Sequence, residues 1–201
     1  GTGQIDLWSI SYLGLFVGAD IVWLSDMVRT GLPASGGFPD ISHYQLPDSS
    51  HSVVTGFQCS PNVVTVANYV NRTHYVDWDL NIQPSGTQTD SIAMNSSAGP
   101  TRTELLKPDI AATGFWVMTA LPVSNAIAFQ SSGNSFRLDQ DGFHERKVGT
   151  SFSSPAVAGI GALLLEKCPN MTTGQFLDLV RNTAYTDVYT AAQGPLPNPR
   201  W

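Results

Sequence analysis

The chain carries one unusually specific segment, Gly149-Thr150-Ser151-Phe152-Ser153-Ser154-Pro155-Ala156-Val157-Ala158-Gly159, which runs directly into the apolar stretch 160–165. A turn of small residues presents a serine, and an apolar helix rich in glycine and alanine is expected to follow at once. Such a serine lies near the positive end of the helix dipole, beside backbone N–H groups that can receive a developing oxyanion. The pattern suits a nucleophile at Ser151. The same residues also suit an ordinary helix start, with Ser151 or Ser153 as N-cap and Pro155 in the first turn.

This segment closely resembles the nucleophile motif of subtilisin-like serine proteases, G-T-S-x-[AS]-x-P-x-V-A-G, and matches every specified position. The resemblance makes Ser151 the catalytic nucleophile. It also implies an α/β fold, a partial subtilisin-like domain with a mostly parallel sheet and packed helices. The G-x-S-x-G elbow of α/β-hydrolases does not fit, because Ser153 stands where its second glycine is required.

Other segments resemble subtilases in the same order along the chain. Residues 95–101 are similar to S-S-x-G-P-T, and residues 107–114 to K-P-D-I-x-A-P-G, with Thr113 in place of the proline. Residues 60–67 are similar to the strand pattern P-x-V-I-x-V-x-A, and residues 166–184 to the helix that follows the nucleophile helix. Together the matches cover roughly residues 52–200, with an atypical insertion between Thr119 and Lys147. Secreted bacterial subtilases come closest in pattern.

Residues 1–201 are therefore expected to form the C-terminal part of one subtilase catalytic domain. Within it, 1–51 is an insertion or loop-rich region, and 52–201 is the core region with the nucleophile helix. Periodicity and turn residues predict strands at 4–10, 52–58, 62–70, 74–80, 90–95 and 115–120, and helices at 151–167 and 172–184. Residues 19–29 read as a helix or an irregular apolar segment, and 31–51 as a loop.

A subtilisin-type triad needs an aspartate and a histidine that precede the serine. The four histidines are His43, His51, His74 and His144, and none has the H-G-T setting of the family. No aspartate has the D-[ST]-G setting either. His144 is seven positions from Ser151, and a solvated loop histidine is the expected reading. The general base and its aspartate are thus expected upstream and missing from this chain, and little or no peptidase activity is expected of it in isolation. The alternative is a non-catalytic binding or scaffold domain with a subtilase-like fold.

The family's oxyanion-hole asparagine, in A-G-N, has two placements. Residues 34–37 align with that loop if glycine replaces the asparagine. Alternatively, the chain starts just after the loop, with residues 1–3 as its downstream arm. The second placement is preferred because residues 30–33 make a poor buried strand. Both ends of the domain are then expected to be cut.

Composition limits the partners. The chain has 201 residues, 42% of them hydrophobic, and a formal net charge of −6. The negative charge argues against nucleic acid or an anionic membrane as a partner. The expected partners are a peptide or protein substrate and the missing N-terminal part of the same domain. No segment reads as a signal peptide, so a secreted or extracellular location is implied by the family resemblance alone.

Two further features concern cysteines and metals. Cys59 and Cys168 permit either one disulfide or a pair of buried thiols. Residues 77–81 open like a calcium loop but lack its glycine and its glutamate, and residues 139–142 with Glu145 form a second oxygen cluster. The expectation is no cofactor and no metal ligand, with calcium as the ion that either cluster would take.

Overall fold

The computed structural model describes residues 54, 56–101, 103–192, 194–196 and 198. Its strands are β1 (Val66–Val70), β2 (His74–Val76), β3 (Ile82–Pro84), β4 (Ile110–Phe115), β5 (Val117–Ala120) and β6 (His144–Lys147). Its helices are α4 (Val123–Ser131), α5 (Thr150–Lys167), α6 (Thr173–Thr183) and α7 (Val188–Ala192), with short 3-10 segments at Gly56–Cys59 and Ser135–Arg137. The elements expected at 4–10, 19–29 and 31–51 lie outside the described residues.

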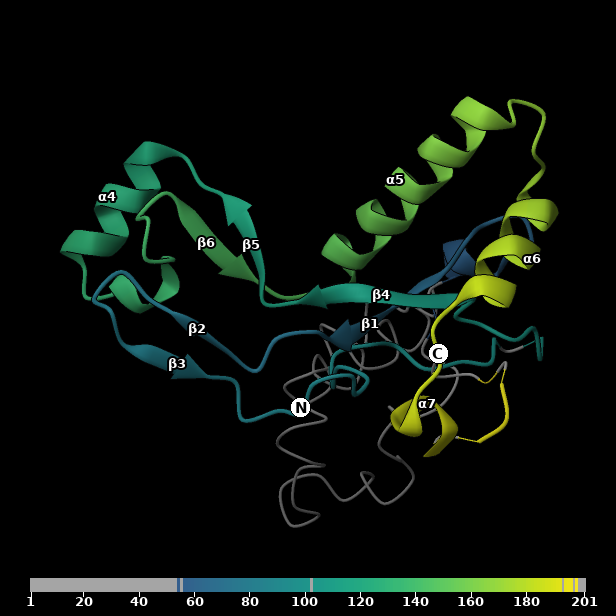
Figure 1. The fold of residues 1–201 in the computed structure, drawn as a ribbon, viewed down its shortest axis with the longest axis horizontal. Coiled ribbons are helices and arrows are strands. Elements are labelled where there is room, and N and C mark those ends of the chain that lie inside the picture. Colours follow the sequence, from purple (N-terminus) through teal and green to yellow (C-terminus); the bar gives the residue numbers. More distant parts are fainter. Residues whose placement is uncertain (1–53, 55, 102, 193, 197, 199–201) are drawn as a thin grey trace, which may run out of the picture.

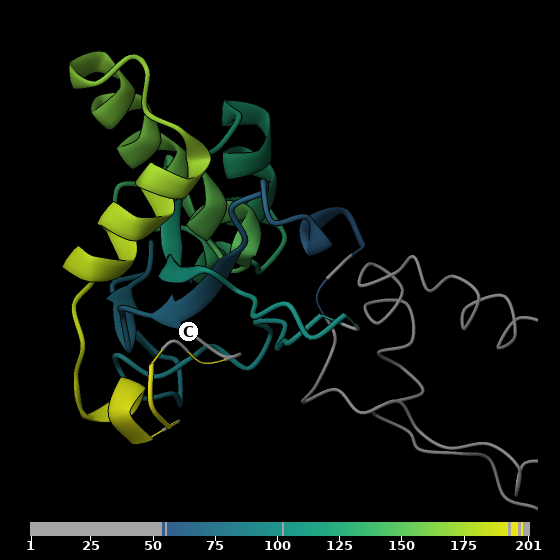
Figure 2. The same cartoon turned by 90° about the vertical axis from the view of Figure 1, so that its right-hand side faces the viewer.

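The centre of the fold is a parallel pair made of β1 and β4. Its register starts with Val66 opposite Ile110 and shifts once, after Tyr69, at the level of Gly114. Helix α5 packs against both strands and turns Val157, which is 5% exposed, toward them. Figures 1 and 2 show α5 and α6 on one side of this pair and α7 on the other. The α/β fold class expected from the sequence is confirmed, with its parallel pairing at the core.

The antiparallel pairs lie apart from this core, in what we call the hairpin lobe (β2–β3, α4 and β5–β6, residues 74–84 and 117–147), at the opposite end of the molecule from α6 and α7 (Figure 1). The Tyr75 ring meets the edge of Trp116 at a centroid distance of 5.2 Å, and the Arg146 guanidinium lies 4.9 Å from the Trp116 centroid. Within the sequence insertion, Leu138 is fully buried, and its carbonyl accepts from the Trp78 N–H at 3.1 Å. The insertion is therefore folded together with the β2–β3 segment and Trp116.

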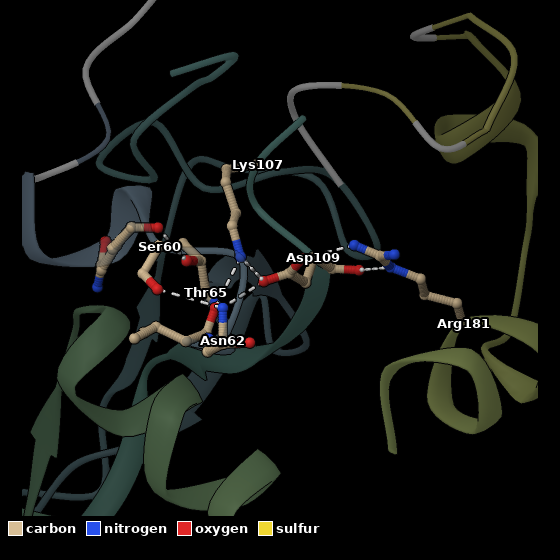
Figure 3. A network of polar contacts seen from close by, with 8 residues as sticks. Ser60, Asn62, Thr65, Lys107, Asp109 and Arg181 are labelled. Carbon is tan, nitrogen blue, oxygen red and sulfur yellow. Dashed lines mark hydrogen bonds and ion pairs between the residues drawn. The ribbon is translucent and has the colours of Figure 1, made fainter. Parts of the chain in front are cut away.

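A buried ion network fixes the amino end of β4 (Figure 3). Asp109 accepts hydrogen bonds from the Thr65 N–H at 2.7 Å and from Lys107 Nζ at 2.6 Å, while its other oxygen meets Arg181 of α6 at 2.5 Å. Lys107 is 1% exposed and also donates to the Val63 carbonyl at 2.7 Å. Buried charges persist only when they are paired in this way. The network joins the chain before β1, the start of β4 and helix α6.

The two expected helices agree with α5 and α6 to within one residue at each end. A capping box explains the start of α6, since Thr172 Oγ1 accepts from the Gln175 N–H and the Gln175 side chain accepts from the Thr172 N–H. The strand expectations were too long. Residues 90–95 form no strand, although Ile92 makes an isolated bridge to Tyr69, and the described part of 52–58 contains a 3-10 segment. Helix α4 was not expected, because neither a side-chain cap nor an acidic first turn marks its start.

Candidate active site

The turn that leads into α5 is tied to the end of β4. The Gly149 N–H donates to the Gly114 carbonyl at 2.8 Å, and the Gly149 carbonyl accepts from the Phe152 N–H at 3.0 Å. Gly149 has φ 145°, which a residue with a side chain rarely adopts. The expected glycine turn is present, and its backbone is anchored to the sheet on one side and to the first helical turn on the other.

Ser151 is the second residue of α5, because the helix begins at Thr150, one residue earlier than expected. Its side chain is exposed, and no side chain caps the helix start. The N–H groups of a first helical turn have no partner within the helix, so they are available to an external acceptor. Pro155 lies inside α5 and lacks an N–H, which also leaves the Ser151 carbonyl without its usual helical donor. The environment thus combines an accessible hydroxyl with a helix N-terminus that no side chain of the described residues caps.

Close packing beneath this turn depends on Gly114. A Cβ at this position would lie 2.2 Å from Ser153 Oγ, 2.5 Å from the Gly149 carbonyl oxygen and 2.8 Å from Asn68 Oδ1. Any side chain larger than hydrogen would push the start of α5 away from β1 and β4. Ser153 and Asn68 are both fully buried, and Ser153 Oγ and Asn68 Oδ1 have no hydrogen-bond partner among the described residues. Such unpaired buried oxygens are uncommon in native structures, so they call for an explanation.

The described histidines lie elsewhere. His144 is the first residue of β6, and its Nδ1 lies 2.5 Å from Asp141 Oδ2, with both side chains nearly half exposed. The backbone N–H of Phe143, together with His144, holds the pKa of Asp141 below its usual range. His74 Nδ1 lies 3.3 Å from Thr73 Oγ1. Within the part of the chain that the structure describes, neither histidine hydrogen-bonds Ser151; His43 and His51 lie outside that part.

The hairpin lobe adjoins the turn before α5 through β6, which ends at Lys147, two residues before Gly149. On β6, the buried carboxylate of Glu145 pairs with Arg137 and, at 2.8 Å, with Lys147. Burial raises the pKa of the Tyr75 phenol, although the nearby Arg146 charge opposes this. Strand β6, which leads into the turn before Ser151, is therefore held in place by the ion pairs of Glu145.

One face of α5 has no cover among the described residues. The helix is apolar almost all round, yet Leu163 is 66% exposed and Ile160 47%. An open apolar pocket of about 410 Å³ lies between β1, α5 and α6; its walls include Val66, Val157 and Phe176. A helix that is hydrophobic on every side is normally buried. Even so, neither α5 nor any other helix of the described ranges has the length and apolarity that crossing a membrane requires.

The metal and cysteine expectations have clear structural positions. Asp77 is buried, and its carboxylate accepts from the Asn81 N–H at 2.8 Å and from Gln83 Nε2 at 2.7 Å, so it serves the β2–β3 turn. Across the described ranges, no three His, Cys, Asp or Glu side chains are grouped so as to hold a metal ion. No disulfide joins Cys59 and Cys168, and the alternative of two buried thiols is also wrong, since Cys59 is partly exposed and Cys168 is exposed.

Sequence reasoning located Ser151 but missed the residues beneath it. The motif comparison covered Gly114 only as a turn signal, and Asn68 drew no attention because a single asparagine in a strand-forming run has no pattern of its own. The Asp109 network was likewise not anticipated, although its Lys107 and Asp109 stand in the quoted K-P-D segment. Only the positions of β1, β4 and α5 reveal these contacts.

Comparison with known proteins agrees with this geometry. The chain is 27% identical over 103 residues to Fervidolysin of Fervidobacterium pennivorans, a match that covers 44% of this chain and 15% of that protein. It is 32% identical over 98 residues to serine protease AprX of Bacillus subtilis (strain 168), covering 49% of this chain and 21% of AprX. The matched region thus spans about a fifth or less of each relative. The profile of the subtilase family matches residues 34–198, and the chain belongs to the subtilase family.

Proposed function

We propose that this protein is a subtilisin-like serine endopeptidase in which Ser151 attacks the peptide carbonyl. The observation that carries the proposal is the placement of Ser151, an exposed serine in the uncapped first turn of α5, on a turn anchored to β4 by the Gly149–Gly114 hydrogen bond. The substrate is a peptide or protein segment, as for the serine peptidases of this family.

In this mechanism Ser151 Oγ forms a bond to the scissile carbonyl carbon while its proton passes to a histidine. The Ser151 N–H donates to the oxygen that becomes negative, which lowers the barrier most when the donor is already in place. The histidine then protonates the leaving amine, and water releases the acyl group by the reverse sequence. Each step uses only proton transfer and acyl transfer, so it requires neither a metal ion nor an organic cofactor.

We further infer that the histidine and its aspartate come from a segment preceding Gly1, so that residues 1–201 are the C-terminal part of the catalytic domain. Two observations support this inference. His74 and His144 contact Thr73 and Asp141 instead of Ser151. The outward face of α5 also exposes large apolar side chains that a preceding segment of the domain would bury.

The proposal is tested with a fluorophosphonate probe, which labels a serine only when a base activates it. The protein that includes the upstream segment should be labelled, and Ser151→Ala should abolish labelling and lower kcat by several orders of magnitude. Ser154→Ala, an exposed serine three residues further along α5, is the matched control and should keep full activity. Residues 1–201 alone should be labelled poorly.

Rapid, stoichiometric labelling of residues 1–201 would contradict the upstream base, and His144→Ala would then identify it if the labelling disappeared. The second candidate function, a non-catalytic binding or scaffold domain, is favoured by the lack of a histidine partner for Ser151 in the described residues. It predicts that the longer protein binds peptides without cleaving them.

A secreted or extracellular location forms part of the same proposal, by analogy with the secreted bacterial subtilases that the motifs resemble. Detection of the protein in the culture medium of its source, rather than in washed cells, is the corresponding test.

A further inference from the structure

One cation of strand β6 has no carboxylate partner in the part of the chain that the structure describes. The Glu145 carboxylate pairs with Lys147 and Arg137. Arg146 enters no ion pair with any described carboxylate, because successive side chains of a strand point to opposite faces and Arg146 faces away from Glu145. Arg146 Nε is buried and has no hydrogen-bond partner among the described residues. A buried N–H without an acceptor costs free energy, so its presence calls for an explanation.

Three aromatic rings surround the Arg146 guanidinium. Its central carbon lies 4.9 Å from the Trp116 ring centroid, 5.5 Å from that of Tyr75 and 6.0 Å from that of Phe136. Trp116 and Tyr75 are buried, whereas Phe136 is 38% exposed and Arg146 itself is partly exposed. Aromatic rings attract a cation but offer its N–H groups no lone pair. The rings therefore orient the guanidinium without satisfying its donors.

The ring nearest to Arg146 belongs to a strained residue close to the turn before α5. Trp116, which joins β4 to β5, has φ 53°. A bulky residue rarely adopts this left-handed conformation, and such strain is found mainly at functional sites. Trp116 follows Gly114 by two residues, and the Gly114 carbonyl accepts from the Gly149 N–H at 2.8 Å. The rings that surround Arg146 are thus tied to the turn that leads to Ser151.

We propose that Arg146 is a specificity residue that binds a carboxylate of the peptide substrate, a role that rests on the proposed peptidase activity of Ser151. Ser151 follows Arg146 by five residues, so their Cα atoms lie at most about 18 Å apart. An extended peptide covers this span with about five residues, which limits how far the carboxylate lies from the scissile bond. A guanidinium matches a carboxylate through two parallel N–H donors. The carboxylate is that of an Asp or Glu side chain or that of the peptide's C-terminus.

The test compares matched peptides as substrates of the protein that includes the upstream segment. One series carries Glu or Gln at successive positions on either side of the scissile bond, and a second series ends in a free or an amidated C-terminus. In one of the two series, the wild type should cleave a charged peptide with a kcat/KM roughly tenfold above that of its neutral match. A preference within the first series assigns the carboxylate to a side chain, and one within the second assigns it to the C-terminus.

Substitutions on β6 then connect the preference to Arg146. Arg146→Met should abolish it, because methionine still packs against aromatic rings but carries no charge. Arg146→Lys should keep part of it, since an ammonium lacks the planar pair of donors. Lys147→Met is the matched control, which also removes one positive charge from β6 and should keep the full preference. Each result is a ratio between two substrates of one variant, so a general loss of activity cancels.

A binding measurement separates this site from the peptidase assignment. In Ser151→Ala of the same longer protein, fluorescence anisotropy of the labelled peptides should give a Kd roughly tenfold lower for the charged peptide than for its neutral match, and adding Arg146→Lys should reduce the difference. Equal Kd values for every matched pair, or a cleavage preference that persists in Arg146→Met, would overturn the carboxylate site. A wild type that cleaves no peptide but binds with this difference would overturn the peptidase assignment and leave the site supported.

Discussion

The buried polar groups at the two ends of strand β4 differ in their hydrogen bonding: those at one end are paired and those at the other are not. At the amino end, both carboxylate oxygens of Asp109 are paired, because they contact Lys107, Arg181 and the Thr65 N–H. At the carboxyl end, Thr113 Oγ1 is buried without a partner in the part of the chain that the structure describes, and the same holds for Ser153 Oγ and Asn68 Oδ1 beside Gly114. The two sets of polar groups lie at opposite ends of the six-residue strand β4, and both include residues from other elements.

We infer from this contrast that the amino end of β4 serves stability and the carboxyl end serves function. A fully paired ion network is destabilising to break and contributes nothing to chemistry by itself. Unpaired polarity next to a serine turn costs stability, and proteins keep such costs mainly at functional sites. We therefore expect changes at the amino end to alter the free energy of unfolding with little change in activity per folded molecule. Changes at the carboxyl end should lower activity per folded molecule, with smaller losses of unfolding free energy than at the amino end.

The largest effect is expected from Lys107→Met. Removal of the ammonium leaves Asp109 buried with Arg181 as its one remaining cation, and breaking a buried pair costs about 3–5 kcal/mol of unfolding free energy. Urea denaturation of the protein that includes the upstream segment measures it. Arg181→Met is the matched control, with a smaller expected loss because that side chain is 37% exposed. Equal losses of unfolding free energy in the two variants would show that the buried lysine contributes no more than the partly exposed arginine.

Gly114→Ala tests the carboxyl end directly. The added Cβ would meet Ser153 Oγ at 2.2 Å and the Gly149 carbonyl at 2.5 Å, so the start of α5 must move. We expect kcat/KM to fall roughly a hundredfold, as for a displaced reacting group, with a loss of about 1–3 kcal/mol in unfolding free energy. Gly159→Ala provides the control, because no atom of another described segment lies within 4 Å of its added Cβ, and alanine favours a helix over glycine by about 1 kcal/mol. Full activity in Gly114→Ala would show that the turn tolerates displacement.

Thr113→Val sharpens the comparison at the level of a single atom. The variant replaces an unpaired buried hydroxyl by a methyl group, and we expect unfolding free energy to stay the same or to rise by up to about 1 kcal/mol. Thr65→Val near the other end removes a hydroxyl that donates to the Gln58 carbonyl at 3.2 Å, so a loss of about 1 kcal/mol is expected there. Thermal unfolding of both variants measures the difference, and an equal loss in the two would contradict it.

The smallest effect concerns Asp187, which caps α7 near the amino end of β4 by accepting from the Tyr189 and Thr190 N–H groups at 2.9 Å each. These bonds, that from Thr190 first, hold the Asp187 pKa below its ordinary value. Asp187→Ala should cost about 1 kcal/mol at pH 7. Because the folded pKa is lowered, the stabilisation is present above the unfolded pKa of about 3.9 and is lost as pH falls through the lower folded value.

The asparagine variant separates capping from charge at this position. Asp187→Asn keeps an acceptor oxygen and does not titrate, so its stability advantage over Asp187→Ala should persist in acid, whereas that of the wild type should shrink. Unfolding midpoints between pH 7 and pH 2 measure the difference. If the stability advantage of the wild type over Asp187→Ala did not depend on pH, the cap would depend on hydrogen-bond geometry and not on the charge of Asp187.

Much of the core could be predicted because its signals are local. The helices α5 and α6 followed from apolar periodicity and turn residues, both of which act within one or two turns. Strand lengths were less accurate, since β1 is five residues long where nine were expected. A strand ends where its hydrogen-bond partner ends, and that partner is β4, more than forty residues away in the chain.

By itself, the sequence determined the family and the glycine turn and indicated Ser151 as the candidate nucleophile, because these depend on residue types at fixed spacing along one segment. The tertiary structure alone decided which distant residues meet that segment. Asn68 reaches Gly114 because β1 pairs with β4, and Arg181 reaches Asp109 because α6 packs beside β4. Such contacts arise from strand register and helix packing, which depend on the whole chain at once and leave no pattern at any single position.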